Sequence, residues 1–546
     1  MLPPATSPAA RRLTLAFLLL GPAAFGLLAL ALGQDANWDL RNYHWYNAYA
    51  FVTGRWAVDV APAQVPSFYN PTLDVPFFLL ADAVPARVAG FVLGALQGAN
   101  LVLLYGLAWT LLRLDPRPRA LSSAALALLG MLGGGTLGLL GTTFYDNVIS
   151  LFVLGGALLV TAAPEDVFRG PVRPAFIRVG IAGFLVGSAV GLKQPSVIFA
   201  VGFCFAFLFV AGSFWRRLFL SFFFGIGVLA AMAVFSGHWM WFLWTDYANP
   251  LFPYFNDLFR SPMGVAEPYR DDKFIPHGLD ALLFPFLWAA DPKEVGEIIF
   301  RDYRVMAMLL VLLATPLMLL AERLLDRTRT ASVVPLSARY LLVSATLIYL
   351  VWLKLFAIYR YLIPLEMLAP IVIAAAIAFW PLSGRARLAV VAAVLALVAV
   401  TAKPGTWGRI PFGERFVEIQ APELPRPDET LVLMTGYAPT SFLVYGFPPQ
   451  VPFLRLQSYL VHPDHGETGI NLRMRRAIEA HKAKGGDFFL LIAHWEVWTI
   501  DNVLPAYGMT ADAKGCAPVT SNLDEPMMLC PARPLAATGA APTNQP

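Results

Sequence analysis

The chain has few charged residues. Only 14% of its 546 residues are Asp, Glu, Lys or Arg, whereas 58% are hydrophobic and the mean hydropathy is +0.61. A water-soluble chain has about a quarter of its residues charged. The scarcity excludes an ordinary soluble protein, intrinsic disorder, a coiled coil, collagen and a nucleic-acid-binding module with a free basic face. The charges that remain are gathered between long apolar runs, so the chain is built for a lipid environment.

The apolar runs have the length of membrane spans. A helix needs about 20 mainly apolar residues to cross a hydrocarbon core of about 30 Å. The sequence therefore predicts an α-helical polytopic membrane protein with about 11 transmembrane helices. The predicted spans are 13–33, 88–112, 120–141, 147–163, 179–195, 196–213, 218–236, 303–321, 339–358, 362–381 and 388–402.

Arginines mark one side of these spans. Arg11 and Arg12 precede the first span, and further arginine clusters follow at alternate connections. Short cytoplasmic loops hold Lys and Arg in excess, so the N-terminus is predicted to be cytoplasmic. The opposite side then receives the loops 34–87 and 237–302 and everything after about 403. A cleavable signal peptide ending near Ala29–Ala31 is an alternative reading of the first span, and it leaves the remaining topology unchanged.

The C-terminal part changes character. Residues 1–404 form the predicted membrane domain, whereas residues 405–535 read as a globular α/β domain and residues 536–546 as a disordered tail. Two buried strands, 431–434 and 488–492, flank a predicted helix over 471–484. Cys516 and Cys530 are the only cysteines outside the spans, and in an oxidising compartment they could form a disulfide.

Five ionisable residues lie next to spans on the predicted non-cytoplasmic side. They are Asp35, Asp39, Asp146, Lys193 and Arg360. Charges beside the membrane are costly and each calls for a partner or a function. Each of them taken alone could merely extend to the membrane surface, and Glu366 could neutralise Arg360 or Lys354 as a structural ion pair. Convergence of all five on one face instead favours a site at the membrane surface.

Acids and cations beside an apolar groove suit transfer from a lipid phosphate. Lys193 and Arg360 could neutralise the departing phosphate of a polyprenyl-phosphate sugar. The acceptor hydroxyl needs a carboxylate to take its proton. With attack opposite the leaving group, a single carboxylate base predicts inversion at the anomeric carbon.

The first predicted loop carries a family resemblance. The segment Asp39-Leu40-Arg41-Asn42-Tyr43, followed by Gly54 and Trp56, resembles the first periplasmic loop of the GT-C glycosyltransferases that use polyprenyl-phosphate sugars, among them the protein mannosyltransferases and the aminoarabinose transferases. Leu40 stands where those enzymes have the second acid of an Asp-Glu pair. The resemblance therefore implies Asp39 as the general base, with Asp146 and Asp35 as further catalytic candidates.

Three further stretches are similar to that family. They are Gly191-Leu192-Lys193-Gln194-Pro195, Arg360-Tyr361-Leu362-Ile363-Pro364 and Asp146-Asn147-Val148-Ile149-Ser150-Leu151. The resemblance implies that Lys193, Arg360 and Tyr361 approach the lipid phosphate. Tyr43, His44 and Arg41 are candidates for a sugar or acceptor groove, although the aromatic residues of this loop could instead anchor an interfacial helix.

These observations predict a glycosyltransferase of the bacterial inner membrane, with its C-terminal domain in the periplasm. It would move a monosaccharide from a polyprenyl-phosphate carrier to a lipid, glycan or protein acceptor. Its expected partners are the bilayer, donor and acceptor, without nucleic acid or a tightly bound cofactor. The sequence assigns no residue to a metal site and leaves dependence on a divalent metal open. A lipid-linked glycan transporter or flippase is one alternative. A non-catalytic membrane scaffold is another.

Overall fold

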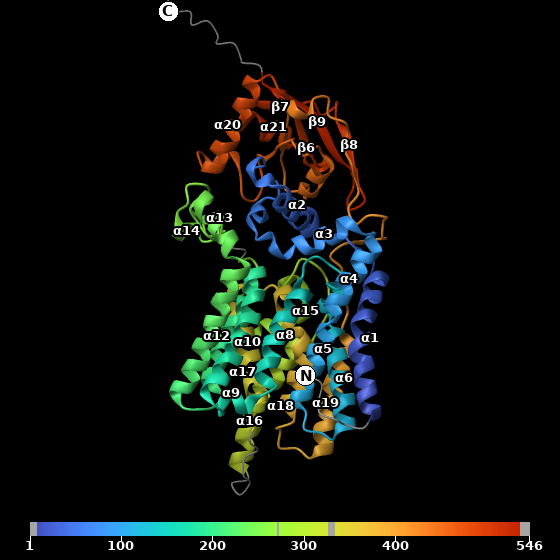
Figure 1. Ribbon diagram of the computed structural model, residues 1–546, viewed down its shortest axis with the longest axis vertical. Coiled ribbons are helices and arrows are strands. Elements are labelled where there is room, and N and C mark those ends of the chain that lie inside the picture. The colour runs from blue at the N-terminus through green and yellow to red at the C-terminus, as the bar shows by residue number, and fades with distance from the viewer. Residues whose placement is uncertain (1–7, 270–271, 326–333, 536–546) are drawn as a thin grey trace, which may run out of the picture. The chain divides into compact units, whose positions relative to one another are not determined.

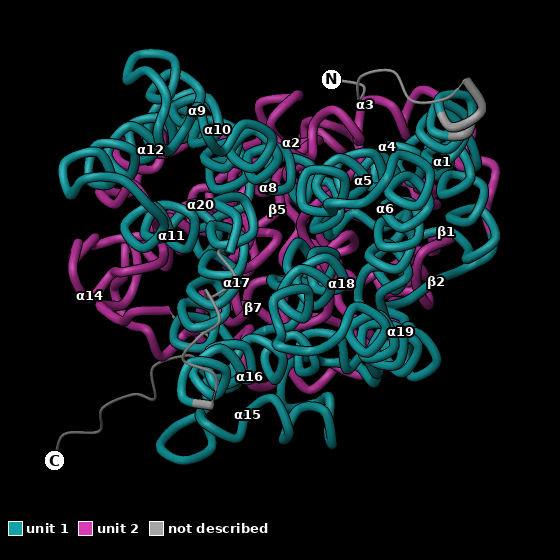
Figure 2. The backbone as a smooth tube through the Cα atoms, turned by 90° about the horizontal axis from the view of Figure 1, so that it is seen from below, with its two compact units in different colours: residues 1–35, 87–238, 271–411 teal, residues 36–86, 239–270, 412–546 magenta. Residues whose placement is uncertain are grey.

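The computed structural model describes residues 8–269, 272–325 and 334–535. It is mostly helical, at 64%, with a sheet domain toward the C-terminus. Contacts divide the chain into two compact units, which Figure 2 distinguishes by colour. Unit 1 comprises residues 1–35, 87–238 and 271–411, and unit 2 comprises residues 36–86, 239–270 and 412–546. Neither unit is continuous in sequence, so each is assembled from three separate segments.

Unit 1 is a bundle of apolar helices. Within the described residues, eight helical stretches are long and apolar enough to cross a membrane. They contain α1 (Pro8–Leu32), α4 (Ala86–Gly98) with α5 (Asn100–Leu111), α10 (Val172–Leu192), α12 (Phe214–Phe235), α16 (Arg304–Leu325), α17 (Leu336–Leu355), α18 (Ile363–Ile377) and α19 (Gly384–Thr401). These helices run side by side in Figures 1 and 2. The chain is therefore a multi-pass membrane protein, as its composition predicts.

Two predicted spans are helical but shorter than a full crossing. They are α8 (Asp146–Thr161), and the stretch 194–209 that contains α11 (Val197–Ala206). The structure also contains an apolar helix, α15 (Leu279–Ala290), inside the predicted loop 237–302. Eight of the eleven predicted spans are thus confirmed as long apolar helices.

The predicted span 120–141 is wrong as one continuous helix. It is divided into α6 (Pro116–Met131) and the short α7 (Gly134–Gly138). Gly133 lies at the break, where an added Cβ would come within 1.9 Å of Glu366 Oε1. Glycine is therefore required for this close approach.

Buried charges satisfy both helix ends at that break. Arg304 donates through Nη1 to the carbonyl of Leu129 (2.6 Å) and through Nη2 to that of Leu132 (2.9 Å) at the end of α6. At the start of α7, Asp302 accepts from the N–H of Gly134 (2.7 Å). Backbone groups that lose their helical hydrogen bonds within a membrane bundle need such partners. The interruption is therefore stabilised by specific side chains of unit 1.

Glu366 belongs to the same network. Its Oε1 accepts hydrogen bonds from the backbone N–H (2.8 Å) and hydroxyl (2.6 Å) of Thr136, and the residue is completely buried. Arg360 lies 3.8 Å from the carboxylate of Glu297, another acid of unit 1.

Unit 2 contains a mixed seven-stranded sheet. Its strands are β3 (Ile419–Gln420), β4 (Thr430–Met434), β5 (Phe453–Arg455), β6 (Asp487–Ile492), β7 (Met509–Ala511), β8 (Ala517–Ser521) and β9 (Met527–Pro534). The order is β3-β8-β9-β6-β4-β5, with β7 also paired to β9. Strands β4, β5 and β6 are parallel, and α20 (Gly469–Ala483) lies between β5 and β6 in the chain. The strands and helix predicted at 431–434, 488–492 and 471–484 are confirmed.

Segments from both long loops complete the core of this sheet. They form α2 (Trp45–Thr53), α3 (Val75–Ala83) and α13 (Gly237–Tyr247). Phe68 and Trp239 are buried in one hydrophobic cluster with Leu433 and Leu490 of the central strands. Val60 also bridges to Leu454 in a parallel sense. The C-terminal segment therefore forms its hydrophobic core together with much earlier parts of the chain. Trp239 and Leu433, for example, are 194 residues apart (433 − 239) and belong to one cluster.

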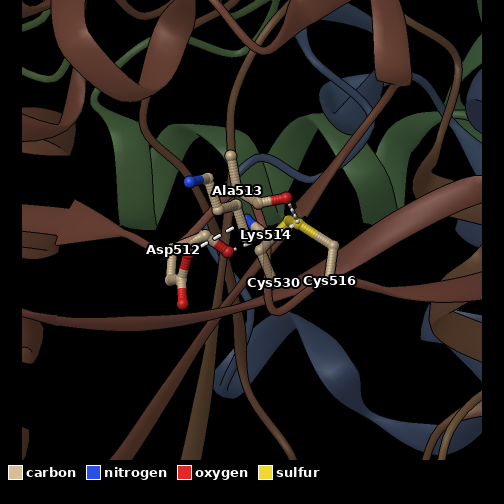
Figure 3. The surroundings of a disulfide bond; sticks show 5 residues. All are labelled: Asp512, Ala513, Lys514, Cys516 and Cys530. Carbon is tan, nitrogen blue, oxygen red and sulfur yellow. Dashed lines mark hydrogen bonds between the residues drawn. A yellow bond between two sulfur atoms is a disulfide. The ribbon is translucent and has the colours of Figure 1, made fainter.

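The disulfide between Cys516 and Cys530 is confirmed (Figure 3). It connects the residue just before β8 to the neighbouring strand β9. The preceding turn is fixed by a hydrogen bond from the Lys514 N–H to Asp512 Oδ1, at 2.9 Å. The predicted disordered tail, 536–546, lies outside the described residues.

Candidate functional site

Three residues predicted from separate motifs meet in unit 1. Asp146 is the first residue of α8, Lys193 directly follows α10, and Tyr361 lies in the 3-10 turn that leads into α18. They line one small pocket together with Ile149, Pro195, Ser196, Phe199 and Pro364. The sequence placed these residues on one side of the membrane part, and the fold brings them into contact distance.

Lys193 is the centre of this cluster. Its Nζ lies 2.6 Å from Asp146 Oδ1 and donates to the carbonyl of Phe144 at 2.8 Å. The same ammonium lies 5.7 Å from the centroid of the Tyr361 ring. The Lys193 side chain is 17% exposed. The Asp146 side chain is 5% exposed, and its Oδ2 makes no hydrogen bond within the part of the chain that the structure describes.

Arg360 contacts the ring of Phe144, whose carbonyl accepts from Lys193. Its Cζ lies 4.2 Å from the centroid of the Phe144 ring, a cation–π geometry. Its Nη2 is 3.8 Å from Glu297 Oε1, beyond hydrogen-bonding distance. Phe144 thus contacts both cations, through its carbonyl and through its ring.

The loop that carries Phe144 is fixed by Asp35. The Asp35 carboxylate, completely buried, accepts from both the N–H (2.7 Å) and the hydroxyl (2.8 Å) of Thr143. Tyr145 adopts a left-handed conformation, with φ of +61°, immediately before α8 begins. Asp35 was predicted as a catalytic candidate, and these contacts show it binding the loop that carries Phe144.

A second group of predicted residues lies in unit 2. Asp39 directly precedes the helical turn Leu40–His44, and its Oδ2 accepts a hydrogen bond from the Tyr43 hydroxyl at 3.2 Å. Asp39 is partly exposed, whereas Tyr43 is buried with its ring centroid 5.3 Å from that of Tyr69. A buried phenol thus donates to the carboxylate of a partly exposed residue.

His44 and Arg41 are each held by an acid within unit 2. His44 Nδ1 is 2.6 Å from Asp74 Oδ1, and this contact fixes the orientation of the buried imidazole. Arg41 forms an ion pair with Asp524, in the turn between β8 and β9. Both residues were predicted to line a sugar or acceptor groove, and the structure shows them also bracing the segment that carries Asp39.

Three contact residues were missed from the sequence. Phe144, Glu297 and Asp74 carry no motif of their own, because an aromatic residue or an isolated acid in a loop is common. Only the position of Phe144, two residues before Asp146, could have suggested it.

The candidate residues therefore form two groups, one in each unit. In unit 1, Asp146, Lys193 and Tyr361 line one small pocket, and Arg360 contacts the ring of Phe144, whose carbonyl accepts from Lys193. Asp39 provides a partly exposed carboxylate in unit 2. No cluster of three or more potential metal ligands occurs among the described residues.

Comparison with known proteins adds no assignment. No family model, curated protein sequence or solved structure matches the chain. The functional argument accordingly rests on the geometry of the two groups and on the motifs that they contain.

Proposed function

We propose that the chain is a membrane glycosyltransferase that moves a monosaccharide from a polyprenyl-phosphate carrier to a periplasmic acceptor, in the manner of the GT-C enzymes. The observation that carries the proposal is the pair of cations around Phe144. Lys193 and Arg360 contact one residue from two different helix ends, and Lys193 lines a small pocket to which Ile149, Pro195, Phe199 and Pro364 contribute apolar side chains. A lipid phosphate requires this combination of positive charge and apolar surroundings.

The two cations suit different parts of the reaction. Cleavage of the bond between the anomeric carbon and the phosphate oxygen leaves the electron pair, and hence additional negative charge, on the phosphate. Arg360 can bind two phosphate oxygens with its planar guanidinium, and Lys193 supplies a compact charge. Fixed cations that face developing charge stabilise a transition state by several kcal/mol in typical cases, about 3 kcal/mol or more.

Asp39 is the proposed general base. Asp39 is a partly exposed residue whose carboxylate accepts a hydrogen bond from the Tyr43 hydroxyl, and in this proposal the acceptor hydroxyl binds beside it. The base removes the acceptor proton as the acceptor oxygen bonds to the anomeric carbon, opposite the leaving phosphate. One such displacement inverts the anomeric configuration. We place the enzyme in the bacterial inner membrane, with unit 2 on the periplasmic side, because arginine-rich connections mark the other side.

A lipid-linked glycan transporter is the second candidate function. The observation in its favour is the interrupted helix α6–α7, with Asp302, Arg304 and Glu366 buried at the break. Transporters use interrupted helices, often in pairs, to bind substrates within the membrane. Here the charged groups are bound to the helix ends themselves, so glycosyl transfer is the better supported function.

Substitution of the proposed base tests this function. In proteoliposomes supplied with polyprenyl-phosphate monosaccharides, Asp39→Asn should lower the transfer rate by about 10²–10⁴-fold, the usual contribution of a general base. Donor binding and the thermal unfolding midpoint should remain at the parent values. Asp246→Asn, which changes an exposed Asp of α13 in the same unit, is the matched control and should retain transfer. Unchanged transfer by Asp39→Asn would contradict the assignment, and donor translocation without transfer would favour the transporter.

A further inference from the structure

Three loops of unit 2 emerge at one edge of its sheet. Residues 435–440 follow β4, residues 456–461 follow β5, and residues 493–498 follow β6. The three strands are adjacent and parallel, in the order β5-β4-β6. Along the chain, β4 is followed by β5, which pairs on one side of it, and then by β6, which pairs on its other side. The strand order therefore reverses at β4. Open α/β sheets bind ligands beyond the carboxyl ends of their strands at such a reversal.

Each of these loops presents an aromatic side chain. Tyr459 is 64% exposed, Trp495 is 50% exposed and Trp498 is 46% exposed. The half-buried Tyr437 packs against Tyr459, with ring centroids 4.7 Å apart. Neighbouring strands lie about 4.8 Å apart, so the three loops that follow them lie next to one another at this edge of the sheet. We call the exposed rings of these loops, together with Tyr437, the aromatic platform.

Hydrogen bonds between the loops fix the platform in place. Glu496 Oε1, from the loop after β6, accepts from the N–H groups of Tyr437 (2.6 Å) and Ala438 (3.1 Å) in the loop after β4. Gln457 Oε1, from the loop after β5, accepts from the Gly436 N–H at 2.8 Å. All three loops are therefore connected through polar groups. Rings held in advance lose little conformational entropy when a ligand stacks on them.

The charge of these loops limits what can bind. They contain no Lys or Arg, and their ionisable residues are His494 and Glu496. Glu496 is 5% exposed, and its Oε2 is buried without a hydrogen-bond partner in the described part of the chain. The nearby Arg455 guanidinium is completely buried and already donates to the carbonyls of Gly436 and Ala438 and to the Thr440 hydroxyl. A phosphate group or a nucleic acid would therefore find no exposed cation in these loops. A neutral ligand with flat apolar faces is the better match.

The platform is also joined to the segment that carries Asp39. The Ser441 hydroxyl, directly after the loop that follows β4, donates to the carbonyl of Asn42. Gln64 Nε2 donates to the Tyr437 carbonyl (2.9 Å) and to Asn42 Oδ1 (3.3 Å). The loop with Tyr437 and the turn that follows Asp39 are thus bonded to each other within unit 2.

We propose that the aromatic platform binds the sugar rings of a neutral glycan, which serves as the acceptor for the transfer. Pyranose rings carry C–H groups on their faces, and these pack against the electron-rich faces of Tyr and Trp. Tyr459, Trp495 and Trp498 supply those faces, and attachment to the turn after Asp39 relates the platform to the proposed base. Assigning the glycan as the acceptor rests on the proposed function, whereas the glycan-binding site itself does not.

Direct binding tests the platform without requiring turnover. The full chain, in a detergent without a sugar headgroup, is titrated by calorimetry with maltotriose, cellotriose and triacetylchitotriose. At least one trisaccharide should bind saturably to the parent. Trp495→Ala and Tyr459→Ala should each weaken that binding by about tenfold, the loss expected for one stacking ring. Trp241→Ala, which removes a 68% exposed ring from α13 of the same unit, is the control and should bind as the parent does.

Several outcomes would overturn the proposal. They are no saturable binding of any trisaccharide, equal binding by the platform variants and the parent, or an equal loss in Trp241→Ala. A further result is that no trisaccharide binds the parent, whereas an apolar Leu/Phe-rich peptide binds the parent and not the platform variants. The surface would then be assigned to a protein partner instead. Trisaccharide binding without any transfer from a polyprenyl donor would contradict the proposed function and leave the glycan site standing. Transfer that proceeds unchanged in variants without trisaccharide binding would contradict the acceptor assignment alone.

Discussion

The pairing of Lys193 with Asp146 permits a decisive test of the phosphate site. If Lys193 only neutralises a buried acid, then removing both residues together should leave the protein unharmed. If Lys193 also binds the donor phosphate, the double variant should fold normally but bind the donor poorly. The variants are Lys193→Met, Asp146→Asn and their combination.

The structure sets the expected magnitudes. Lys193 Nζ and Asp146 Oδ1 are 2.6 Å apart, and the Asp146 side chain is only 5% exposed. Removing one partner of such a buried pair costs about 3–5 kcal/mol of stability. Lys193→Met should therefore lower the thermal unfolding midpoint, and the double variant should recover most of the loss because no buried charge is left unpaired.

Donor binding should follow a different order. A charge-assisted hydrogen bond contributes about 1.5–3 kcal/mol, which corresponds to about 10- to 150-fold in the dissociation constant. Lys193→Met and the double variant should both lose this amount. Asp146→Asn should bind the donor at least as tightly as the parent, since it removes the carboxylate that competes with phosphate for Lys193.

The assay is equilibrium binding of labelled polyprenyl phosphate to purified protein in detergent, alongside thermal unfolding of each variant. The stability ranking and the binding ranking are independent measurements of the same three proteins. A double variant that is as stable as the parent and binds polyprenyl phosphate equally well would refute the phosphate role of Lys193. The pair would then be a structural contact only.

Three further predictions concern stability. Arg304→Met should destabilise unit 1 by about 3–5 kcal/mol, because it leaves Asp302 buried without its cation; an unchanged thermal unfolding midpoint would contradict the role of this network at the α6–α7 break. Replacing Cys516 and Cys530 by Ser should cost about 3 kcal/mol, since the disulfide closes a loop with a sequence separation of 14; reductant should lower the midpoint of the parent and leave that of the variant unaltered. Burial raises the pKa of Glu496, so the folded state holds this proton more tightly than the unfolded state. The contribution of Glu496 to stability is therefore complete below the normal carboxyl pKa. It falls as the pH rises from that value through the raised pKa of the folded state. Glu496→Gln should accordingly raise the unfolding midpoint most at neutral pH and least below the normal carboxyl pKa, and a difference independent of pH would contradict this reasoning.

Some residues of the site were predictable because charged residues are rare in a membrane-spanning sequence. An apolar span makes any charge conspicuous, and the burial cost of that charge requires a local reason. Asp146, Lys193 and Arg360 were identified on this basis, together with Tyr361 from its motif. Their partners Phe144 and Glu297 were not, since neither residue type is unusual where it stands in the sequence.

The break between α6 and α7 shows the limit of hydropathy. The segment 120–141 has the length and apolarity of a span, and only its glycines hinted at an interruption. The decisive groups are Arg304, Asp302 and Glu366, which lie at least 168 residues later in the chain than the backbone groups that they contact. No local pattern contains that information.

The sequence by itself determined the solvent of this protein, most of its long helices and the central strands of its sheet domain. These features depend on local periodicity, length and composition, which determine how a segment buries its apolar side chains. Tertiary structure alone decided that two distant loops join the C-terminal segment around one core, with Trp239 beside Leu433. It also decided that Lys193 contacts Asp146 and that three strand ends share an aromatic platform. Such contacts join residues far apart in the chain, and only the packing of the folded molecule specifies them.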